Sequence, residues 1–469
     1  GLALAELLLP FMNAAAGTAL ELTYFGADGV AWVLLATVVI IGTLAGVYPA
    51  FLLSRYAPAQ VLASSRAPGS GRSGSRVREA LVIAQFAIAI TFIVATAVIF
   101  AQTLYVRAAD LGFERRGILI VTSLRNRELS DAQRSAFVER ARSLAGVRAV
   151  TQSDAAPGDG SVSNAGSVGR PGTTQRRPTL SQVRVGQDFF ATYSARMLAG
   201  RALNARFGMD DLAEATGAAP ATAARNTVIN RSAAALLGFK SPEAAVGKAI
   251  EMDVAGGRRP LTIAGVIEDM RFESLRGPVS PTLYLYQSTA ITNPVASLRF
   301  TGGDADVTAA VAQLWRSMVP QIPFEAVTAE RSLAALYASD DQRSRLFLAG
   351  AVVAVLISCL GLYGLATFTT AQRTKEIGIR KALGASRRDV LLLVGGQMLR
   401  PVLLANVIAW PIAFFAMRSW LEGFDRRIDL GIIFFLSAGL LAATIAAVTV
   451  LAQVLRISGA EPAWALRHE

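Results

Sequence analysis

The chain has 469 residues, of which 53% are hydrophobic and only 17% are charged, and its mean hydropathy is +0.43. Soluble domains carry about 25% charged residues, so this composition indicates a membrane protein with a sizeable part in water. The formal charge of +12 does not indicate nucleic-acid binding, because no such motif accompanies it and much of the excess flanks apolar runs.

Cysteine and histidine usage argues against an enzyme. Cys359 is the single cysteine and lies in an apolar run, while His468, the single histidine, lies next to the C-terminus. An intramolecular disulfide, a His-based metal centre and a catalytic triad are therefore unsupported. We expect no catalytic residue, no metal site and no cofactor. The chain begins at Gly1 inside an apolar stretch with no signal-peptide start, which favours a fragment without its true N-terminus.

Apolar runs of membrane-spanning length recur along the chain. A span takes about 20 apolar residues. The opening run, 1–12, is too short and is interpreted as the end of a cut helix. The predicted spans cover 32–53, 81–106, 346–371, 390–417 and 432–455.

The charges between these runs predict the orientation, because cytoplasmic loops carry an excess of Lys and Arg. Residues 55–78 hold five Arg and no acid, and 373–388 hold six basic residues against one Glu. In contrast, 13–29 hold two acids and no base, and 418–429 are balanced. Placing the first two loops inside and the other two outside exports the segment from about 107 to 342.

The exported segment shows mixed structure. "FVERARSLAGVRAV", 137–150, has helical spacing, while "RPLTIAGVIED", 259–269, and "ASLRF", 296–300, are typical of strands. The Gly/Ser/Pro-rich residues 154–179 are predicted to form a mobile loop. The predicted fold is therefore an α-helical membrane bundle with an inserted α+β extracytoplasmic domain, in one or two lobes.

No nucleotide site is predicted. The nearest approach to a P-loop, "SPEAAVGKAI" at 241–250, has Pro242 in place of the first Gly and Ala249 in place of the Mg²⁺-binding hydroxyl. A surface turn is the better interpretation. Glu268 and Asp269 are adjacent, so they would face opposite sides of a strand, which favours an ordinary strand end over an acid/base pair.

Two features of the membrane part are candidates for function. Arg400 lies within a predicted span and is followed by Pro401, so it either snorkels or pairs structurally, or it serves a hinge or coupling role. "QRTKEIGIRKALGASRRDV", 372–390, predicts a short amphipathic helix that ends at Gly384, followed by a new helix start at Ser386. Charge alone supports a lipid anchor equally well, whereas the capped stop favours a docking helix for a cytoplasmic partner.

Several motifs resemble the ABC transporter permeases of the MacB/FtsX type. "KEIGIRKALGAS", "WPIAF" at 410–414 and the final "PAWALRHE" resemble their membrane part, and segments within 81–119, 188–203 and 245–284 resemble their periplasmic core domain. The matching nonapeptides at 54–62 and 458–466, both S-x-x-x-P-A-x-x-L, favour an internal duplication. In the two-repeat members of the family, a first helix and a first core domain precede the part that this sequence resembles.

The resemblance implies a function and a docking site. Such permeases dimerise or pair with a similar half, and they bind a separate cytoplasmic ATPase, which binds ATP, through the short helix that corresponds to 373–385 here. A periplasmic adaptor and membrane lipids are further implied partners. The implied ATPase-docking residues are Lys375, Glu376, Ile377, Gly378, Ile379, Arg380, Lys381, Leu383 and Gly384, with Arg400 and Pro401 as intramembrane candidates.

The predicted organisation follows from these elements. It comprises a partial first-repeat bundle at 1–56, a basic linker at 57–77, a helix at 78–106, the core domain at 107–342 and a membrane domain at 343–469. The predicted function is that of an ABC permease subunit in the plasma (inner) membrane, for export or extracytoplasmic substrate handling. The alternatives are an FtsX-like regulator of an extracytoplasmic hydrolase and a membrane receptor.

Overall fold

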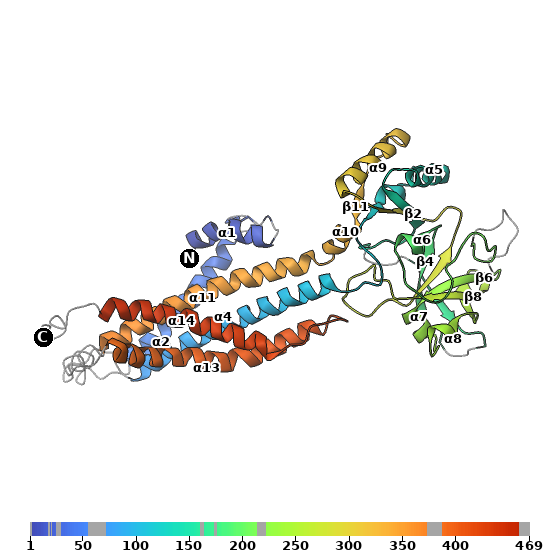
Figure 1. Cartoon of the computed structure of the whole chain (residues 1–469). Helices are drawn as coiled ribbons and strands as arrows, with labels where there is room; N and C mark the ends of the chain where they lie inside the picture. Colours follow the sequence, from blue (N-terminus) through green and yellow to red (C-terminus); the bar gives the residue numbers. More distant parts are fainter. Residues whose placement is uncertain are drawn as a thin grey trace, which may run out of the picture. The chain divides into compact units, whose positions relative to one another are not determined.

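The chain divides into two compact units, each described here by itself (Figure 1). The membrane unit comprises Gly1–Thr103, Asp340–Glu422 and Ile428–Glu469, and the extracytoplasmic unit comprises Leu104–Ser339 and Gly423–Arg427. The computed structural model describes residues 2–16, 19, 21–24, 30–54, 72–159, 164–172, 176–212, 222–372 and 387–458.

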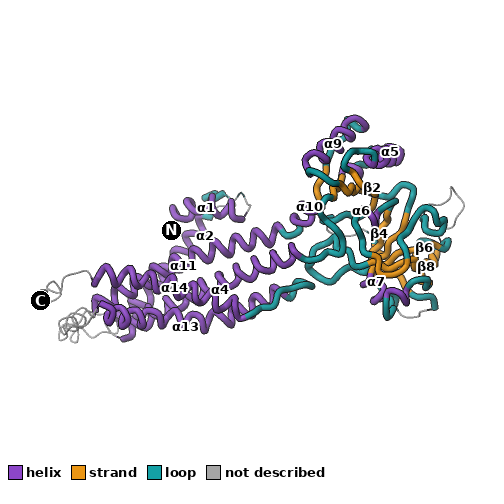
Figure 2. The backbone as a smooth tube through the Cα atoms, viewed as in Figure 1, coloured by secondary structure: helices purple, strands orange, loops and turns teal. Residues whose placement is uncertain are grey.

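The membrane unit is built from long apolar helices (Figure 2). Its helices are α1 (Leu2–Ala16), α2 (Ala31–Ser54), α4 (Arg72–Ala108), α11 (Ala338–Gln372), α13 (Arg387–Leu421) and α14 (Ile432–Ser458). Among the described residues, four stretches are long and apolar enough to span a membrane, namely Val77–Ala108, Ala338–Phe368, Leu399–Leu421 and Ile432–Ala452. These stretches overlap the last four predicted spans. In α2, the apolar stretch Ala31–Thr43 is shorter than these four. Helix α4 begins within the predicted linker, so the last residues of that linker are helical.

Small residues let α13 and α14 approach closely. Three alanines of α13 and three of α14 recur at every fourth position, so each set forms one stripe along its helix. All six are buried in a core that α4 and α11 complete with larger side chains such as Phe86 and Leu362. The alanines are Ala405, Ala409 and Ala413, and Ala438, Ala442 and Ala446.

The extracytoplasmic unit is an α+β domain around one 11-stranded sheet. Its strands are β1 (Ile118–Val121), β2 (Val147–Ser153), β3 (Ala165–Gly169), β4 (Thr179–Val185), β5 (Met197–Gly200), β6 (Arg225–Asn230), β7 (Ala249–Val254), β8 (Gly257–Ile267), β9 (Thr282–Tyr286), β10 (Val295–Phe300) and β11 (Ala326–Thr328). Its short helices are η1 (Thr122–Arg125), α5 (Asp131–Arg142), α6 (Phe189–Thr192), α7 (Arg231–Leu236), α8 (Pro242–Ala245), α9 (Asp304–Met318) and α10 (Ala329–Ala335). The strands predicted at 259–269 and 296–300 are confirmed as β8 and β10.

The sheet supports two lobes with separate cores. In the first lobe, β11, β1, β10 and β2 pair in that order, all antiparallel. Their core includes residues of α5 and α9, where Phe137 meets Trp315 edge to face at 5.1 Å. The indole of Trp315 is buried and donates a hydrogen bond to the Ile322 carbonyl at 2.8 Å, which satisfies its polar atom.

In the second lobe the strands close on themselves. Strand β4 pairs with β3 on one side and, in parallel, with β9 on the other, while β7, β8 and β6 complete the path between them. The lobe core is aliphatic and includes Leu180, Ile229 and Ile263, each fully buried.

Two sequence-based expectations need correction here. The helical pattern predicted at 137–150 stops early, because α5 ends at Arg142 and Gly146 turns the chain at φ +85° before β2. The stretch predicted as a loop at 154–179 contains β3, which pairs with β4 and β7.

At 241–250 the chain forms α8 and a turn at Gly247 before β7, in agreement with the predicted surface turn.

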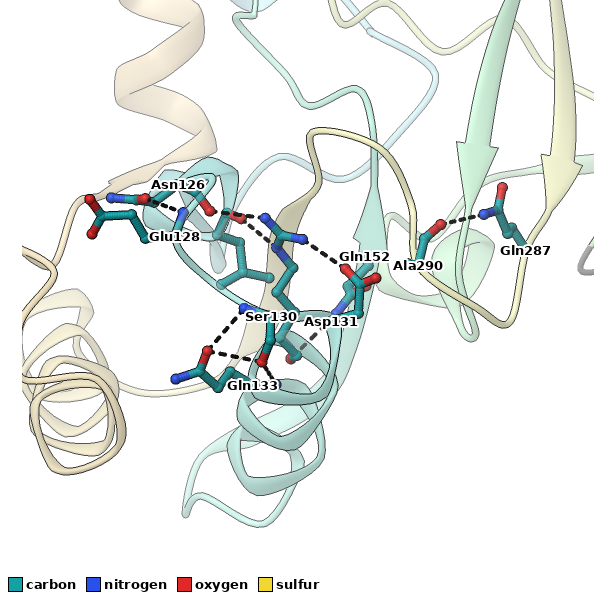
Figure 3. A network of polar contacts seen from close by, with 10 residues as sticks. Asn126, Glu128, Ser130, Asp131, Gln133, Gln152, Gln287 and Ala290 are labelled. Atoms are coloured by element: carbon teal, nitrogen blue, oxygen red, sulfur yellow. Dashed lines mark hydrogen bonds and ion pairs between the residues drawn. The ribbon is translucent and has the colours of Figure 1, made fainter.

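The start of α5 is fixed by side-chain caps (Figure 3). The Ser130 hydroxyl accepts a hydrogen bond from the Gln133 backbone N–H at 3.3 Å, and the Gln133 side chain accepts one from the Ser130 backbone N–H at 2.9 Å. This capping box satisfies two N–H groups that a helix start leaves without partners. Arg134 then ties the preceding turn to the helix, since its guanidinium donates to the carbonyls of Leu124 and Asn126.

Candidate functional site

The predicted ATPase-docking residues lie between two membrane helices. Helix α11 ends at Gln372 and α13 begins at Arg387. The residues from 373 to 386, which include all nine predicted docking positions from Lys375 to Gly384, lie outside the described residues. Their docking role therefore stays a prediction. The two nonapeptides of the proposed repeat lie outside the described residues in the same way, except for their first residues, Ser54 and Ser458.

Arg400 and Pro401 lie within α13 and point to different surroundings. Arg400 is exposed, and within the described part of the chain it makes no hydrogen bond or ion pair, whereas Pro401 is buried. The neighbouring Val402 is fully buried in the helical core. A guanidinium that leaves the bundle in this way must reach the headgroups or a partner protein. The coupling role of Arg400 stays a prediction.

A hydrogen-bonded polar side chain of α13 lies against a glycine of α14 inside the membrane unit. Asn406 donates from its side-chain amide to the Val402 carbonyl at 2.8 Å and accepts a hydrogen bond from the Trp410 indole at 3.0 Å. The amide oxygen faces Gly439 of α14, where an added Cβ would overlap it. Gly439 therefore leaves the space that a satisfied polar side chain needs in an apolar core.

A second close approach joins α4 and α11. Gly361 of α11 lies against the side chain of Gln85 on α4, and an added Cβ would overlap the amide oxygen of Gln85. Gly361 is thus a packing position. Gly42, Gly46 and Gly364 have no atom within 4 Å of a Cβ at their positions.

The extracytoplasmic unit holds a polar cleft of about 480 Å³. Glu268 at the end of β8 accepts hydrogen bonds from Arg196 at 2.7 Å and from Arg231 at 2.9 Å. Asp269 accepts from the backbone N–H of Ser232 at 2.9 Å and from its hydroxyl at 2.7 Å, which caps the start of α7. Both acids therefore have structural partners at this strand end.

Other charged residues complete the lining of this cleft. They come from the chain that follows α4, from the turn after β8, and from the short loop between α13 and α14. These residues are Asp110, Arg271, Asp425 and Arg426. Among the described residues, no group of three or more His, Cys, Asp or Glu is arranged to hold a metal ion. Sequence reasoning missed the meeting of these segments, since its one signal was the balanced charge of 418–429.

Comparisons with known families cover most of the chain. Residues 80–314 match the family described as the MacB-like periplasmic core domain, and residues 348–462 match the FtsX-like permease C-terminal family. The first match takes in α4 and nearly all strands of the extracytoplasmic unit. The second takes in most of α11, the undescribed residues 373–386, α13 and α14.

Individual relatives are distant or matched over short stretches. The macrolide export ATP-binding/permease protein MacB of Bdellovibrio bacteriovorus is 30% identical over 103 residues, which are 21% of this chain and 15% of that protein. The chain thus matches only a small part of the length of this curated relative.

Solved structures of related domains align at low identity. The periplasmic region of MacB from Actinobacillus actinomycetemcomitans aligns with 48% of this chain and 95% of its own at 13% identity, with a TM-score of 0.34. The extracellular domain of the noncanonic ABC-type transporter YknZ from Gram-positive bacteria aligns with 41% of this chain and 87% of its own at 12% identity, with a TM-score of 0.28.

The family matches and the fold agree on the cellular location. In the part of the chain that the structure describes, four helices are long and apolar enough to cross a membrane, and the core-domain family places the sheet-bearing unit outside the cytoplasm. The chain is a multi-pass inner-membrane protein with an extracytoplasmic domain. Because a core-domain match over half of its length is followed by an FtsX-like C-terminal match, the chain belongs to the MacB/FtsX-type ABC transporter permeases.

Proposed function

We propose that this chain is the membrane subunit of an ABC system in which a separate cytoplasmic ATPase drives movement of the extracytoplasmic unit. The observation that carries the proposal is the FtsX-like permease match at 348–462, which includes residues 373–386 between α11 and α13. Export or extracytoplasmic handling of a substrate is the purpose that we propose.

The docking surface that we propose is the short helix at 373–385. Ile377 and Ile379 supply apolar anchors, and Glu376 and Arg380 are spaced to pair on a neighbouring face. An apolar contact ringed by fixed charges gives a partner both affinity and register. The remaining proposed docking residues are Lys375, Gly378, Lys381, Leu383 and Gly384.

The proposed division of labour follows the predicted organisation. The segment at 107–342 moves outside the membrane, and the domain at 343–469 receives the ATPase. We propose that the segment at 1–56 belongs to the first of two repeats and that 57–77 links the two. A second permease half and an extracytoplasmic adaptor complete the assembly in this proposal.

Charge reversal tests the docking role. Glu376→Lys and Arg380→Glu should each abolish co-purification of the ATPase, while the double variant should restore part of it because the pair re-forms with opposite signs. Membrane insertion should stay intact, since each single change leaves the loop strongly basic. Arg140→Glu, an exposed reversal on α5, is the matched control. Unchanged ATPase recovery with both single variants would refute the docking role.

An FtsX-like regulator of an extracytoplasmic hydrolase would use the same docking surface without moving a substrate. The genes beside the one for this chain separate the two roles. A neighbouring adaptor supports export, and a neighbouring cell-wall or peptide hydrolase supports regulation.

A further inference from the structure

Residues 269–277 of the extracytoplasmic unit, here called the junction segment, contact three stretches of chain that each lead directly into a membrane helix. The first stretch is the chain that leaves α4. The Arg271 backbone N–H donates a hydrogen bond to the Leu111 carbonyl at 2.9 Å. Gly112 adopts φ +78° and lies so close to the Asp269 carbonyl that no side chain would fit there.

The second stretch is the end of the extracytoplasmic chain just before α11. The Tyr337 hydroxyl accepts a hydrogen bond from the Leu275 backbone N–H at 2.8 Å. Both residues are buried, at 6% and 1% exposure. Tyr337 immediately precedes the first residue of α11, so this contact fixes the entry of that helix to the junction segment.

The third stretch is the loop Gly423–Arg427 between α13 and α14, which belongs to the extracytoplasmic unit although both helices belong to the membrane unit. Phe424 and Arg276 are partners in an antiparallel β-bridge, and the Asp425 backbone N–H donates to the Leu275 carbonyl at 3.2 Å. The Phe424 ring is buried, with the Arg276 guanidinium 4.7 Å from its centroid. The loop therefore pairs with the junction segment as a short strand would.

An ion pair locks this pairing. The Arg271 guanidinium, whose side chain is 6% exposed, is paired with the Asp425 carboxylate and also donates to the Gly277 carbonyl at 3.2 Å. A buried guanidinium that loses its carboxylate is left as an uncompensated charge, which is strongly unfavourable. Arg426 adds a weaker bond to the Asp110 carbonyl at 3.4 Å, again on the chain that leaves α4.

We propose that Gly423–Arg427 is a clamp through which α13 and α14 act on the extracytoplasmic unit. An inserted domain is joined by the chain only to the helices that flank it, here α4 and α11. The clamp gives the α13–α14 hairpin its own hold on the same junction segment. Asp425, Phe424 and Arg271 are the positioning residues of this link. The inference rests on the proposed function, because α13 begins directly after the proposed docking helix.

The first measurement tests the clamp without any ATPase. Amide hydrogen exchange of residues 269–277 is followed in the full chain in lipid nanodiscs. Asp425→Asn and Phe424→Ala should each speed exchange at Leu275 roughly tenfold, because a charge-assisted bond or a buried ring is lost. Glu422→Gln is the matched control. It removes an exposed ion pair with Arg418 of α13, at 3.3 Å, and leaves the contacts of Gly423–Arg427 in place. Unchanged exchange in both clamp variants would overturn the proposal.

The second measurement tests transmission. Arg276→Cys and Phe424→Cys are combined in a Cys359→Ala background, since directly opposed bridge residues lie at a distance that a disulfide can span. The readout is the change in exchange at 269–277 when the co-purifying ATPase is trapped with ATP and vanadate. The double-cysteine variant should show no such change in exchange when it is reduced. The change should return when oxidation joins the two cysteines by a disulfide.

The outcomes separate the two proposals. An equal response in the reduced and oxidised proteins means that α13 does not act through the clamp, and overturns the inference while the ATPase link stands. If no ATPase co-purifies with the unmodified chain, the proposed function fails. In that case the exchange rates of the first measurement still decide whether the clamp holds the junction segment.

Discussion

The amide oxygen of Asn406 on α13 occupies the space that Gly439 on α14 leaves free. In the same place, Asn406 accepts the hydrogen bond of the Trp410 indole at 3.0 Å. One polar side chain thus sets the separation of the two helices and also satisfies a second polar group in the apolar core.

Gly439→Val should therefore destabilise the membrane unit. The new side chain must displace the Asn406 amide, which breaks the bond to Trp410 or separates the helices, at a cost of about 1–3 kcal/mol. The measurement is the thermal unfolding midpoint of the full chain in detergent.

Gly364→Val on α11 is the matched control, because a Cβ at that position meets no atom within 4 Å. Its midpoint should change little. Equal losses from the two valines would mean that the contact at Gly439 is not what limits stability.

The stability of the extracytoplasmic unit should fall in acid through Asp210. Burial raises the pKa of this carboxyl, but hydrogen bonds from Arg201, Asn226 and the Asn204 backbone bring it below the ordinary value. A lowered folded-state pKa gives stability that is present above the unfolded pKa of about 3.9 and is lost as the pH falls through the folded value. Asp210→Asn should cost roughly 1–3 kcal/mol at pH 7 and flatten this acid loss.

Asp154 provides a control of opposite sign. Burial raises the pKa of its carboxyl above the ordinary value, despite hydrogen bonds from the Arg184 backbone and Asn164. Its contribution to stability therefore grows as the pH falls through the folded-state pKa. Denaturant unfolding between pH 3 and pH 7, followed by near-ultraviolet circular dichroism, should show opposite changes of slope for Asp154→Asn and Asp210→Asn. Parallel curves for the two variants would contradict this assignment.

The cap of α5 should be measurable locally. Ser130→Ala removes the hydroxyl that accepts from the Gln133 backbone N–H and should destabilise the helix by about 1 kcal/mol. Hydrogen exchange of the first-turn amides of α5 reports this loss. Ser317→Ala on α9 is the comparison, since its exposed hydroxyl only donates to the Leu314 carbonyl one turn earlier. If the two variants exchange alike, the capping box does not stabilise α5.

Features with a local physical cause were predictable from the sequence. A bilayer requires continuous apolar helices, so hydropathy located the spans in α4, α11, α13 and α14. Alternating residues likewise revealed β8 and β10. Strand β3 was missed because its Gly- and Ser-rich residues, 165–169, owe their structure to pairing with β4 and β7 rather than to their own preferences.

The contacts at the junction segment could not be predicted. Arg271 and Asp425 are 154 positions apart, and the sequence between them contains two membrane helices, α11 and α13. Local patterns show that both residues are charged and lie near strand or helix ends. They do not show that the folded chain brings the two together.

The clamp also has a consequence for biosynthesis. Residues 104–339 are synthesised before 423–427, so Arg271 is made before the carboxylate that pairs with it in the folded chain. Only after α13 has been inserted does the loop arrive outside the membrane and neutralise that charge. Pairing of Arg271 therefore depends on insertion of a helix that follows the domain in the chain, and we expect a product without that helix to leave Arg271 without its carboxylate.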